Sequence, residues 1–365
     1  MASAGVLDFD RLLTPIAGDN PAGSDLRQDF AHDSIYRQIR AVRADARRAE
    51  RDALYEEGRV GLLRNDATDW KPILELAPLA ITEKSKDLEI VALWIEALVR
   101  AHGFAGLRDG FRLARALAEG FWDHLYPSPD EDGMITRVAP LTALNGDEGE
   151  GVLIQPIRKV IIAQGRSVGP FSLLQYQTAS TAGGSSDGQP DPVTKEMFET
   201  AVNETPPEWF ANLLEDISEC SDEFQKLCEV LDEKCGQDES GFSMAPPSSN
   251  IRDALQECRQ TVKRVSSHLL GTPAEEEEAA AATETGPAAA VPGQIQTRQE
   301  ALRVLQLAAD FFRRTEPHSP ISFALEQVVR WGNTPLPHLL SELIPDDSAR
   351  EHLFKLVGIQ PPENE

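Results

Sequence analysis

The stretch Ala309-Asp310-Phe311-Phe312-Arg313-Arg314-Thr315-Glu316-Pro317-His318-Ser319-Pro320 carries the clearest local signals in this chain of 365 residues. Apolar side chains lead into it at helical spacing, and Pro317 ends the helix that they form, because proline lacks a backbone donor and clashes with the preceding turn. Ser319 is a preferred N-cap, and Pro320 suits the first position of a helix. The stretch therefore predicts two consecutive helices joined by a short turn.

Signals on both sides extend this pattern to four short helices. Thr297 and Glu300 form a capping box at the start of the first helix, and Gly332 is expected to end the second. Two further helices are expected between Thr334 and Val357. A helical module of this size has only a marginal core on its own. We therefore expect segment 297–360 to be completed by a neighbouring copy.

Composition describes an ordinary globular chain with a strong acidic excess. Hydrophobic residues make up 41% and charged residues 26%, with a formal net charge of −25. This excess argues against general binding to nucleic acid or anionic membranes, because phosphate groups would be repelled. No apolar run approaches the roughly 18 residues of a membrane-spanning helix, and Met1–Asp10 lacks the features of a signal peptide. We expect a cytoplasmic protein with no membrane insertion.

We expect no cofactor and no metal site. The four cysteines lie in one helical region without the C-x-x-C spacing of metal ligands, so we interpret them as reduced thiols; they are Cys220, Cys228, Cys235 and Cys258. The P-loop, G-x-G-x-x-G, H-E-x-x-H and G-x-S-x-G motifs are also absent from the sequence. The sequence therefore predicts that the protein is not an enzyme, although many active sites have no local motif.

Shifts in composition divide the chain into five segments. A Gly/Ser-rich stretch at 179–190 and an acidic, Ala/Pro-rich stretch at 271–296 are expected to be flexible linkers. They separate an N-terminal domain at 1–178, a middle helical domain at 191–270 and the C-terminal module at 297–360. The predicted fold class is mainly α: a multi-domain helical protein with flexible linkers and a small C-terminal oligomerising module.

Apolar spacing in the N-terminal segment predicts a largely helical domain. Val152–Ile162 is rich in Val and Ile but contains Pro156, which favours an edge strand. Gly103 is expected to separate two neighbouring helices. One long helix is expected to begin at about Ser34. Three further helices are expected at about Trp70–Ala80, Lys86–His102 and Leu107–Ala118.

The helix that begins near Ser34 is rich in arginine, which suggests either of two surfaces. A basic helix can bind nucleic acid, but no aromatic residues are interleaved here to stack on bases. The alternative is a solvated face on which Asp45, Glu50 and Asp52 pair with the arginines. We favour the solvated face.

The middle segment contains two apolar seams at alternating spacings of three and four residues. One runs from Phe210 to Leu231 and the other from Ile251 to Leu269, with Pro246-Pro247 in the turn between them. Seams of this kind pack helix against helix. We expect the two helices to form a hairpin that packs on itself, with intermolecular coiled-coil pairing as the alternative.

Stretches at both ends of the chain resemble one family. Pro15-Ile16-Ala17-Gly18-Asp19-Asn20-Pro21-Ala22-Gly23-Ser24-Asp25-Leu26-Arg27, Asp69-Trp70, Trp122-Asp123-His124-Leu125-Tyr126-Pro127 and Gly169-Pro170-Phe171-Ser172-Leu173 resemble the ImpA-type N-terminal domain of TssA proteins from type VI secretion systems. The stretch Phe311–Ser322, with Val329-Arg330-Trp331-Gly332 and Pro335-Leu336-Pro337, resembles the C-terminal domain of the short, baseplate-associated TssA class. The middle segment and the acidic linker match this family by position only.

The resemblance implies a cytoplasmic, non-enzymatic assembly protein. Its C-terminal domains would form a homo-oligomeric ring that engages the secretion baseplate and helps to prime assembly of the tail tube and sheath. The expected partners are thus other copies of the chain and the baseplate, tube and sheath proteins. The longer TssA class fits less well, because this sequence has no hydrophobic C-terminal tail.

Five residues of the C-terminal module are the candidate contacts of that ring or of a baseplate partner: Phe311, Phe312, Arg313, Arg314 and Trp331. Adjacent phenylalanines point about 100° apart on a helix, so one of them can face the core and the other a neighbour. Two other classes of function stay open. One is an enzyme with a site in the N-terminal domain around Asp19, Asn20 and His124, and the other is nucleic-acid binding through the paired arginines.

Overall fold

The computed structural model describes most of the N-terminal three quarters of the chain and part of the C-terminal quarter. Its residues are mainly helical, as predicted, and the chain divides into two compact units, Met1–Thr283 and Glu284–Glu365. Each unit is considered by itself. The described residues are 2–56, 69–131, 133–147, 149–181, 193–238, 241, 243–270, 305, 309, 313 and 320–333.

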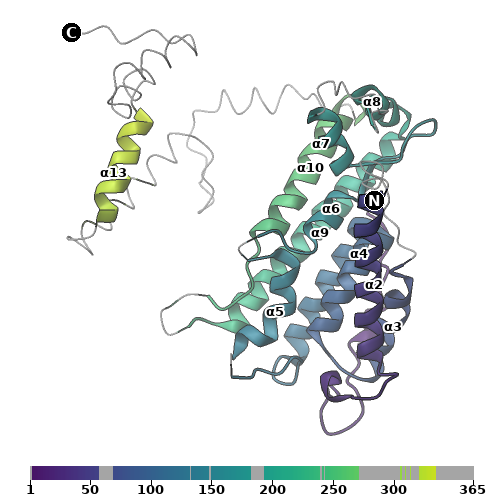
Figure 1. Ribbon diagram of the computed structural model, residues 1–365, viewed down its shortest axis with the longest axis vertical. Helices are drawn as coiled ribbons and strands as arrows, with labels where there is room; N and C mark the ends of the chain where they lie inside the picture. Colours follow the sequence, from purple (N-terminus) through teal and green to yellow (C-terminus); the bar gives the residue numbers. More distant parts are fainter. Residues whose placement is uncertain are drawn as a thin grey trace. The chain divides into compact units, whose positions relative to one another are not determined.

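Helix α4 (Leu88–Phe121) is the centre of the Met1–Thr283 unit (Figure 1). By length and composition it resembles a membrane span, with an 18-residue window of mean hydropathy 1.4, but 83% of that window is buried inside the protein. Its apolar side chains are therefore used to build the core. The helices packed around α4 are α2 (Ile35–Glu56), α3 (Lys71–Glu83), α5 (Met134–Asn145), α6 (Ile154–Arg158) and α9 (Pro207–Cys235).

Gly103 interrupts the helical geometry of α4, in agreement with the predicted break between two helices. Its backbone has φ 57° and ψ −137°, so the helix is kinked there. Glycine adopts positive φ without the steric cost that a Cβ atom imposes. A Cβ at this position would also lie 3.2 Å from Cγ1 of Val160. The kink thus depends on glycine.

The edge strand predicted at Val152–Ile162 is wrong for most of its length. Ile154–Arg158 forms α6, and the strand β1 covers only Ile161–Ala163, paired antiparallel with β2 (Phe171–Ser172). Pro156 lies in the first turn of α6, where a missing backbone N–H costs nothing. Burial of the Ile154 and Ile157 side chains, three residues apart on one helical face, favours the helix.

The two seams of the middle segment pack against each other, as predicted for a hairpin. They lie on α9 and α10 (Ser249–Leu270). Helix α9 also packs along α4, where the Phe111 and Phe224 ring centroids lie 4.8 Å apart. Seam residues such as Ile217 and Cys258 are fully buried within the chain. Most of the apolar surface of the two seams is therefore used within the chain, while Val265 and Leu269 near the end of α10 are partly buried.

The N-terminal arm, residues 2–7, spans α4 and α9. The Ser3 backbone N–H and hydroxyl donate to the Asp216 carboxylate of α9, at 2.7 and 2.6 Å. The Val6 N–H donates to Asp109 of α4 at 2.6 Å, and Arg108 donates to the Ser3 carbonyl at 3.0 Å. The first residues of the chain therefore tie the middle helices to the N-terminal ones within one core.

Smaller elements complete this unit. They are α1 (Phe9–Leu12), the 3-10 helix η1 (Leu26–Gln28), α7 (Leu173–Thr181) and α8 (Lys195–Glu204). Helix α7 extends into the stretch predicted as the first linker, and 182–192 lies outside the described residues.

The arginines of α2 are less solvated than predicted. Arg48 does pair with Asp45, at 3.2 Å, but Arg43 and Arg47 both bind Glu96 of α4, at 2.7 and 3.3 Å. The Glu96 side chain is only 2% exposed. A buried carboxylate needs charged or hydrogen-bonding partners, and the sequence of α2 alone cannot show which element supplies it.

Helix α13 (Pro320–Asn333) is the described helix of the C-terminal unit. It begins at Pro320, as predicted, and ends one residue beyond the predicted stop at Gly332. Leu305 and Ala309 are helical, and Ala309 is buried. The capping box at Thr297 and the two helices expected after Thr334 lie outside the described residues.

Candidate functional site

Two of the five candidate contact residues fall within the described part of the C-terminal unit. Arg313 is exposed and forms an ion pair with Glu326 of α13. Trp331 lies on α13 and is half-buried. Phe311, Phe312 and Arg314 lie outside the described residues.

Helix α13 also presents apolar side chains that the sequence reasoning missed. Phe323 is 63% exposed and Val328 is 42% exposed. Ala324, Val328 and Trp331 follow the i, i+4, i+7 spacing of one helical face, with Phe323 at its edge. This spacing was visible in the sequence, but it does not reveal which side of a helix faces its own core. We call Phe323, Val328 and Trp331 the α13 face.

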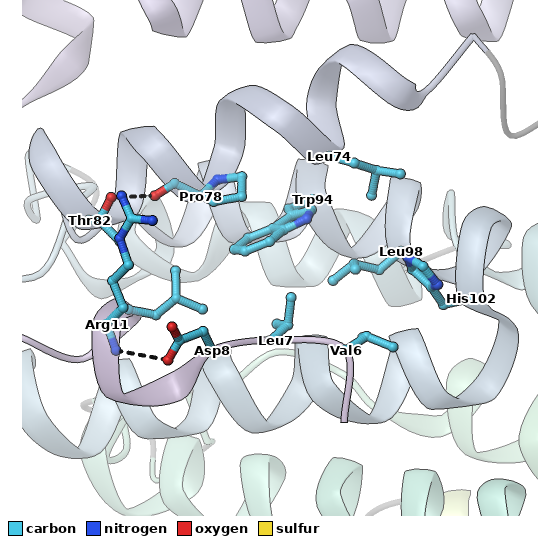
Figure 2. Close-up of a pocket in the computed structure, with 11 residues that line it drawn as sticks. Val6, Leu7, Asp8, Arg11, Leu74, Pro78, Thr82, Trp94, Leu98 and His102 are labelled. Carbon is cyan, nitrogen blue, oxygen red and sulfur yellow. Dashed lines mark hydrogen bonds between the residues drawn. The ribbon is translucent and has the colours of Figure 1, made fainter. Parts of the chain in front are cut away.

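A second candidate is a pocket of about 240 Å³ in the Met1–Thr283 unit. Figure 2 shows the Trp94 indole lying between α3, which contributes Leu74 and Pro78, and Leu7 of the N-terminal segment. Asp8 accepts a hydrogen bond from the Arg11 N–H at 3.3 Å and so caps α1 at the rim.

The polar edge of the Trp94 ring is unusual. Trp94 is 3% exposed, and its Nε1–H has no hydrogen-bond partner. Because Nε1 is itself closed off from solvent, a bound group in the pocket cannot reach it without movement of the wall. The pocket combines an apolar wall of Leu7, Leu74 and Trp94 with polar side chains of Asp8, Arg11, Thr82 and His102.

Arg27, at the end of the segment Pro15–Arg27 that resembles the ImpA-type domain, has a structural role. Arg27 Nη1 binds Asp87 at 2.7 Å and Asp25 at 2.8 Å, and its Nε lies 3.5 Å from Glu89. Asp87 is fully buried and caps α4 by accepting the Glu89 and Ile90 N–H groups. Burial raises the pKa of Asp87 to about 6, although Arg27 opposes that rise. Arg27 thus holds the start of the central helix.

A buried lysine stands beside this cluster. Lys86 is fully buried, and its Nζ donates to the carbonyls of Leu12 and Ile81 at 2.7 and 2.9 Å. These carbonyls lie near the ends of α1 and α3, where helices leave acceptors unpaired. Burial lowers the pKa of Lys86 to about 8. Its ammonium joins three elements and has no room for a substrate.

The residues of the enzyme hypothesis are Asp19, Asn20 and His124, and Asn20 has structural contacts. The Asn20 amide donates to the Tyr126 hydroxyl at 3.1 Å, and its oxygen accepts the Ala22 N–H at 3.0 Å, so both ends fix the turn. Asp19 and His124 are exposed. Among the described residues, no group of three or more His, Cys, Asp or Glu side chains is arranged to hold a metal ion.

Comparison with known proteins relates both units to one family. A family model described as "ImpA, N-terminal, type VI secretion system" matches residues 13–146. The chain is 25% identical to the type VI secretion system component TssA1 of Pseudomonas aeruginosa over 347 residues, which cover 93% of this chain and 96% of that protein. The chain is therefore similar to a TssA component of the type VI secretion system over nearly its whole length.

A solved structure extends the likeness in fold beyond the ImpA region. The N-terminal domain of the TssA component from Burkholderia cenocepacia, which includes the conserved ImpA_N region, matches with a TM-score of 0.55 at 22% identity. The match covers 73% of this chain and 98% of the solved one. That share exceeds residues 13–146, so the shared fold also includes helices that follow the segment matched by the family model.

Proposed function

We propose that this TssA-type chain is a non-enzymatic assembly component whose C-terminal unit forms a homo-oligomeric ring. The ring engages the secretion baseplate on its cytoplasmic side and helps to prime polymerisation of the tail tube and sheath, as in the short TssA class. The observation that carries the proposal is the α13 face. Phe323 and Val328 are large apolar side chains at 63% and 42% exposure in a small unit of its own.

Exposed apolar side chains in a cluster favour association. Fully buried aromatic residues at subunit contacts contribute about 2 kcal/mol or more each, and a second copy supplies a complementary face without any new sequence. Trp331 lies on the same helix. The resemblance of Phe311–Ser322 to the C-terminal TssA domain supports the same unit as the ring-forming part.

The domain plan belongs to the proposal. We propose that 297–360 assembles, that 271–296 tethers it, and that residues 1–270 project from the ring. Limited proteolysis is expected to release a fragment beginning near Thr297, because the tether is acidic and rich in small residues. Cleavage within the helices of Met1–Thr283, with 271–296 intact, would contradict this plan.

The mass of the intact chain tests the central claim. Light scattering coupled to size exclusion is expected to give a large oligomer for the full chain and a monomer for residues 1–270. Phe311→Ala and Phe312→Ala, made one at a time, are expected to show which phenylalanine lies at the contact: assembly is lost while helicity is kept. A monomeric full chain would sink the proposal.

A further inference from the structure

A second surface lies in the Met1–Thr283 unit, where a cleft of about 360 Å³ opens between α2, α4 and α6. Four cationic side chains line it: Arg47 and Arg51 from α2, Arg100 from α4, and Lys159 directly after α6. Val152 and Pro156 add an apolar strip. We call these six residues the basic cleft.

The first acid in this cleft is already neutralised. Glu50 accepts two hydrogen bonds from the Arg100 guanidinium, at 2.6 and 3.0 Å, and a third from Trp70 Nε1 at 2.9 Å. The Arg100 guanidinium also stacks 3.9 Å from the Trp70 ring centroid. Burial acts to raise the pKa of Glu50, but the hydrogen bonds and charge of Arg100, the Trp70 hydrogen bond and the charge of Lys159 together outweigh it, and the pKa is lowered.

The second acid at the cleft is also occupied. Glu150 accepts from Arg158 at 2.7 Å through one oxygen and from the Gln155 amide at 3.0 Å through the other. These hydrogen bonds lower the pKa of Glu150. Both acids thus have their main hydrogen-bond partners within the protein, and Glu50 also attracts Lys159.

Three cations remain undercompensated. Arg47 shares the single carboxylate of Glu96 with Arg43. In the described part of the chain, no carboxylate lies within ion-pairing distance of Arg51 or Lys159. Burial lowers the pKa of Lys159, and Arg100 lowers it further against the attraction of Glu50. Arg47 and Lys159 are half-buried and Arg51 is exposed, and neighbouring cations of this kind are stabilised by a bound anion.

We propose that the basic cleft binds an acidic peptide segment of a partner protein, with Asp or Glu carboxylates on Arg47, Arg51 and Lys159. An apolar side chain between those carboxylates packs on Val152 and Pro156. Arginine clusters recognise acidic motifs through paired N–H donors that match carboxylate geometry. The proposal concerns the Met1–Thr283 unit and does not depend on assembly by α13.

The charge of the whole chain favours a short acidic segment over an extended polyanion. The net charge is −25, so a long nucleic acid would meet net repulsion from the chain as a whole. A carboxylate pair flanked by neutral or basic residues gains the local attraction without that repulsion. Charge complementarity therefore favours a protein partner with a localised acidic motif.

The test uses the full-length chain and a short labelled peptide in which Glu residues flank a central Leu, with fluorescence anisotropy as the readout. The matched control peptide carries Gln in place of Glu. The cleft variant is Arg51→Glu with Lys159→Glu, since neither side chain forms an ion pair with another described residue. The control variant, Arg37→Glu with Arg259→Glu, makes the same charge change at exposed sites on α2 and α10.

We expect the acidic peptide to bind and the Gln peptide not to bind, with affinity falling as salt rises. The cleft variant should weaken binding about tenfold or more, and the control variant less than about twofold. Absence of binding, or equal loss in both variants, would overturn the proposal. Tighter binding of a single-stranded oligonucleotide than of the acidic peptide would also overturn it. The oligomeric mass of the chain is measured on the same samples. It shows whether the ring proposal fails independently of the peptide-binding proposal.

Discussion

Helices α4 and α13 are both apolar, yet their apolar surfaces have different partners. In α4 the chain itself covers nearly every side: Ile95 and Leu107 are 0% exposed, and 83% of its most apolar window is buried. In α13 the large residues Phe323 and Val328 stay 63% and 42% exposed. The two helices lie in separate compact units.

The difference shows that apolar composition predicts burial of a helix face. It does not tell whether the same chain or a second molecule covers that face. Helix α4 has α2, α3, α5, α6 and α9 around it, so its side chains contribute to the folding free energy of one chain. Exposed apolar side chains on α13 contribute little to that free energy and leave a surface for a second molecule. The following predictions test this contrast, from the largest expected effect to the smallest.

Truncation of an α4 core residue should give the largest loss of stability. Phe111 is 1% exposed and packs on Phe224 of α9. We expect Phe111→Ala to lower the free energy of unfolding by about 3–5 kcal/mol, because a cavity is left between two long helices. Urea unfolding followed by helicity measures this. A loss below about 1 kcal/mol would mean that α4 and α9 do not share a core.

The start of α4 should make the stability of the chain depend on pH. Burial raises the pKa of Asp87 to about 6 from 3.8, so the folded state holds this proton more tightly than the unfolded state. Its contribution to stability is therefore greatest below about pH 4 and is lost as pH rises through 6, by up to about 3 kcal/mol. We expect the difference in unfolding free energy between the native chain and Asp87→Asn to fall over that window. A constant difference would contradict the raised pKa.

Substitution on α13 should change association while leaving folding intact. We expect Phe323→Ala to weaken assembly by about 2 kcal/mol per contact and to change the helicity of the chain little. The matched control is Phe30→Ala, which removes a 78% exposed phenylalanine from the other unit. Concentration-dependent mass distinguishes the two variants. Equal loss of assembly in both would show that exposure alone, and not the α13 face, explains association.

Thiol labelling should report on the Met1–Thr283 unit alone, since all four cysteines lie in it. Burial raises the pKa of Cys235 to about 11 and of Cys258 to about 12, and Cys220 is fully buried. Only the thiolate reacts. Near pH 8 we expect half-buried Cys228 to be alkylated first and the other three at the rate of unfolding. Fast labelling of Cys258 in the folded chain would contradict its burial.

Much of the fold follows from local signals. The start of α13 at Pro320, the kink at Gly103 and the pairing of α9 with α10 were all predicted, because caps, glycine and apolar periodicity act over a few residues. The strand expected at Val152–Ile162 was wrong. Val and Ile favour a strand locally, whereas packing of Ile154 and Ile157 against the core favours the helix α6.

Some residues of the candidate sites were identified from the sequence, and others became visible only in the structure. Trp331 was identified from sequence, while Phe323 and Val328 were missed, because exposure depends on which face of α13 meets its own core. The basic cleft was missed for a related reason. Its cations come from α2, α4 and the end of α6, and their effect depends on which acids are already paired across those elements.

The sequence by itself determined a mainly helical chain, its principal helix ends and its resemblance to TssA proteins. These features rest on interactions between neighbouring residues and on quoted stretches that need no coordinates. Tertiary structure alone decided that α9 and α10 share a core with α4, that Glu96 binds Arg43 and Arg47, and that Glu50 is occupied by Arg100. The reason is that burial and charge compensation are set by residues distant in sequence, and no local pattern specifies which of many acids meets a given arginine.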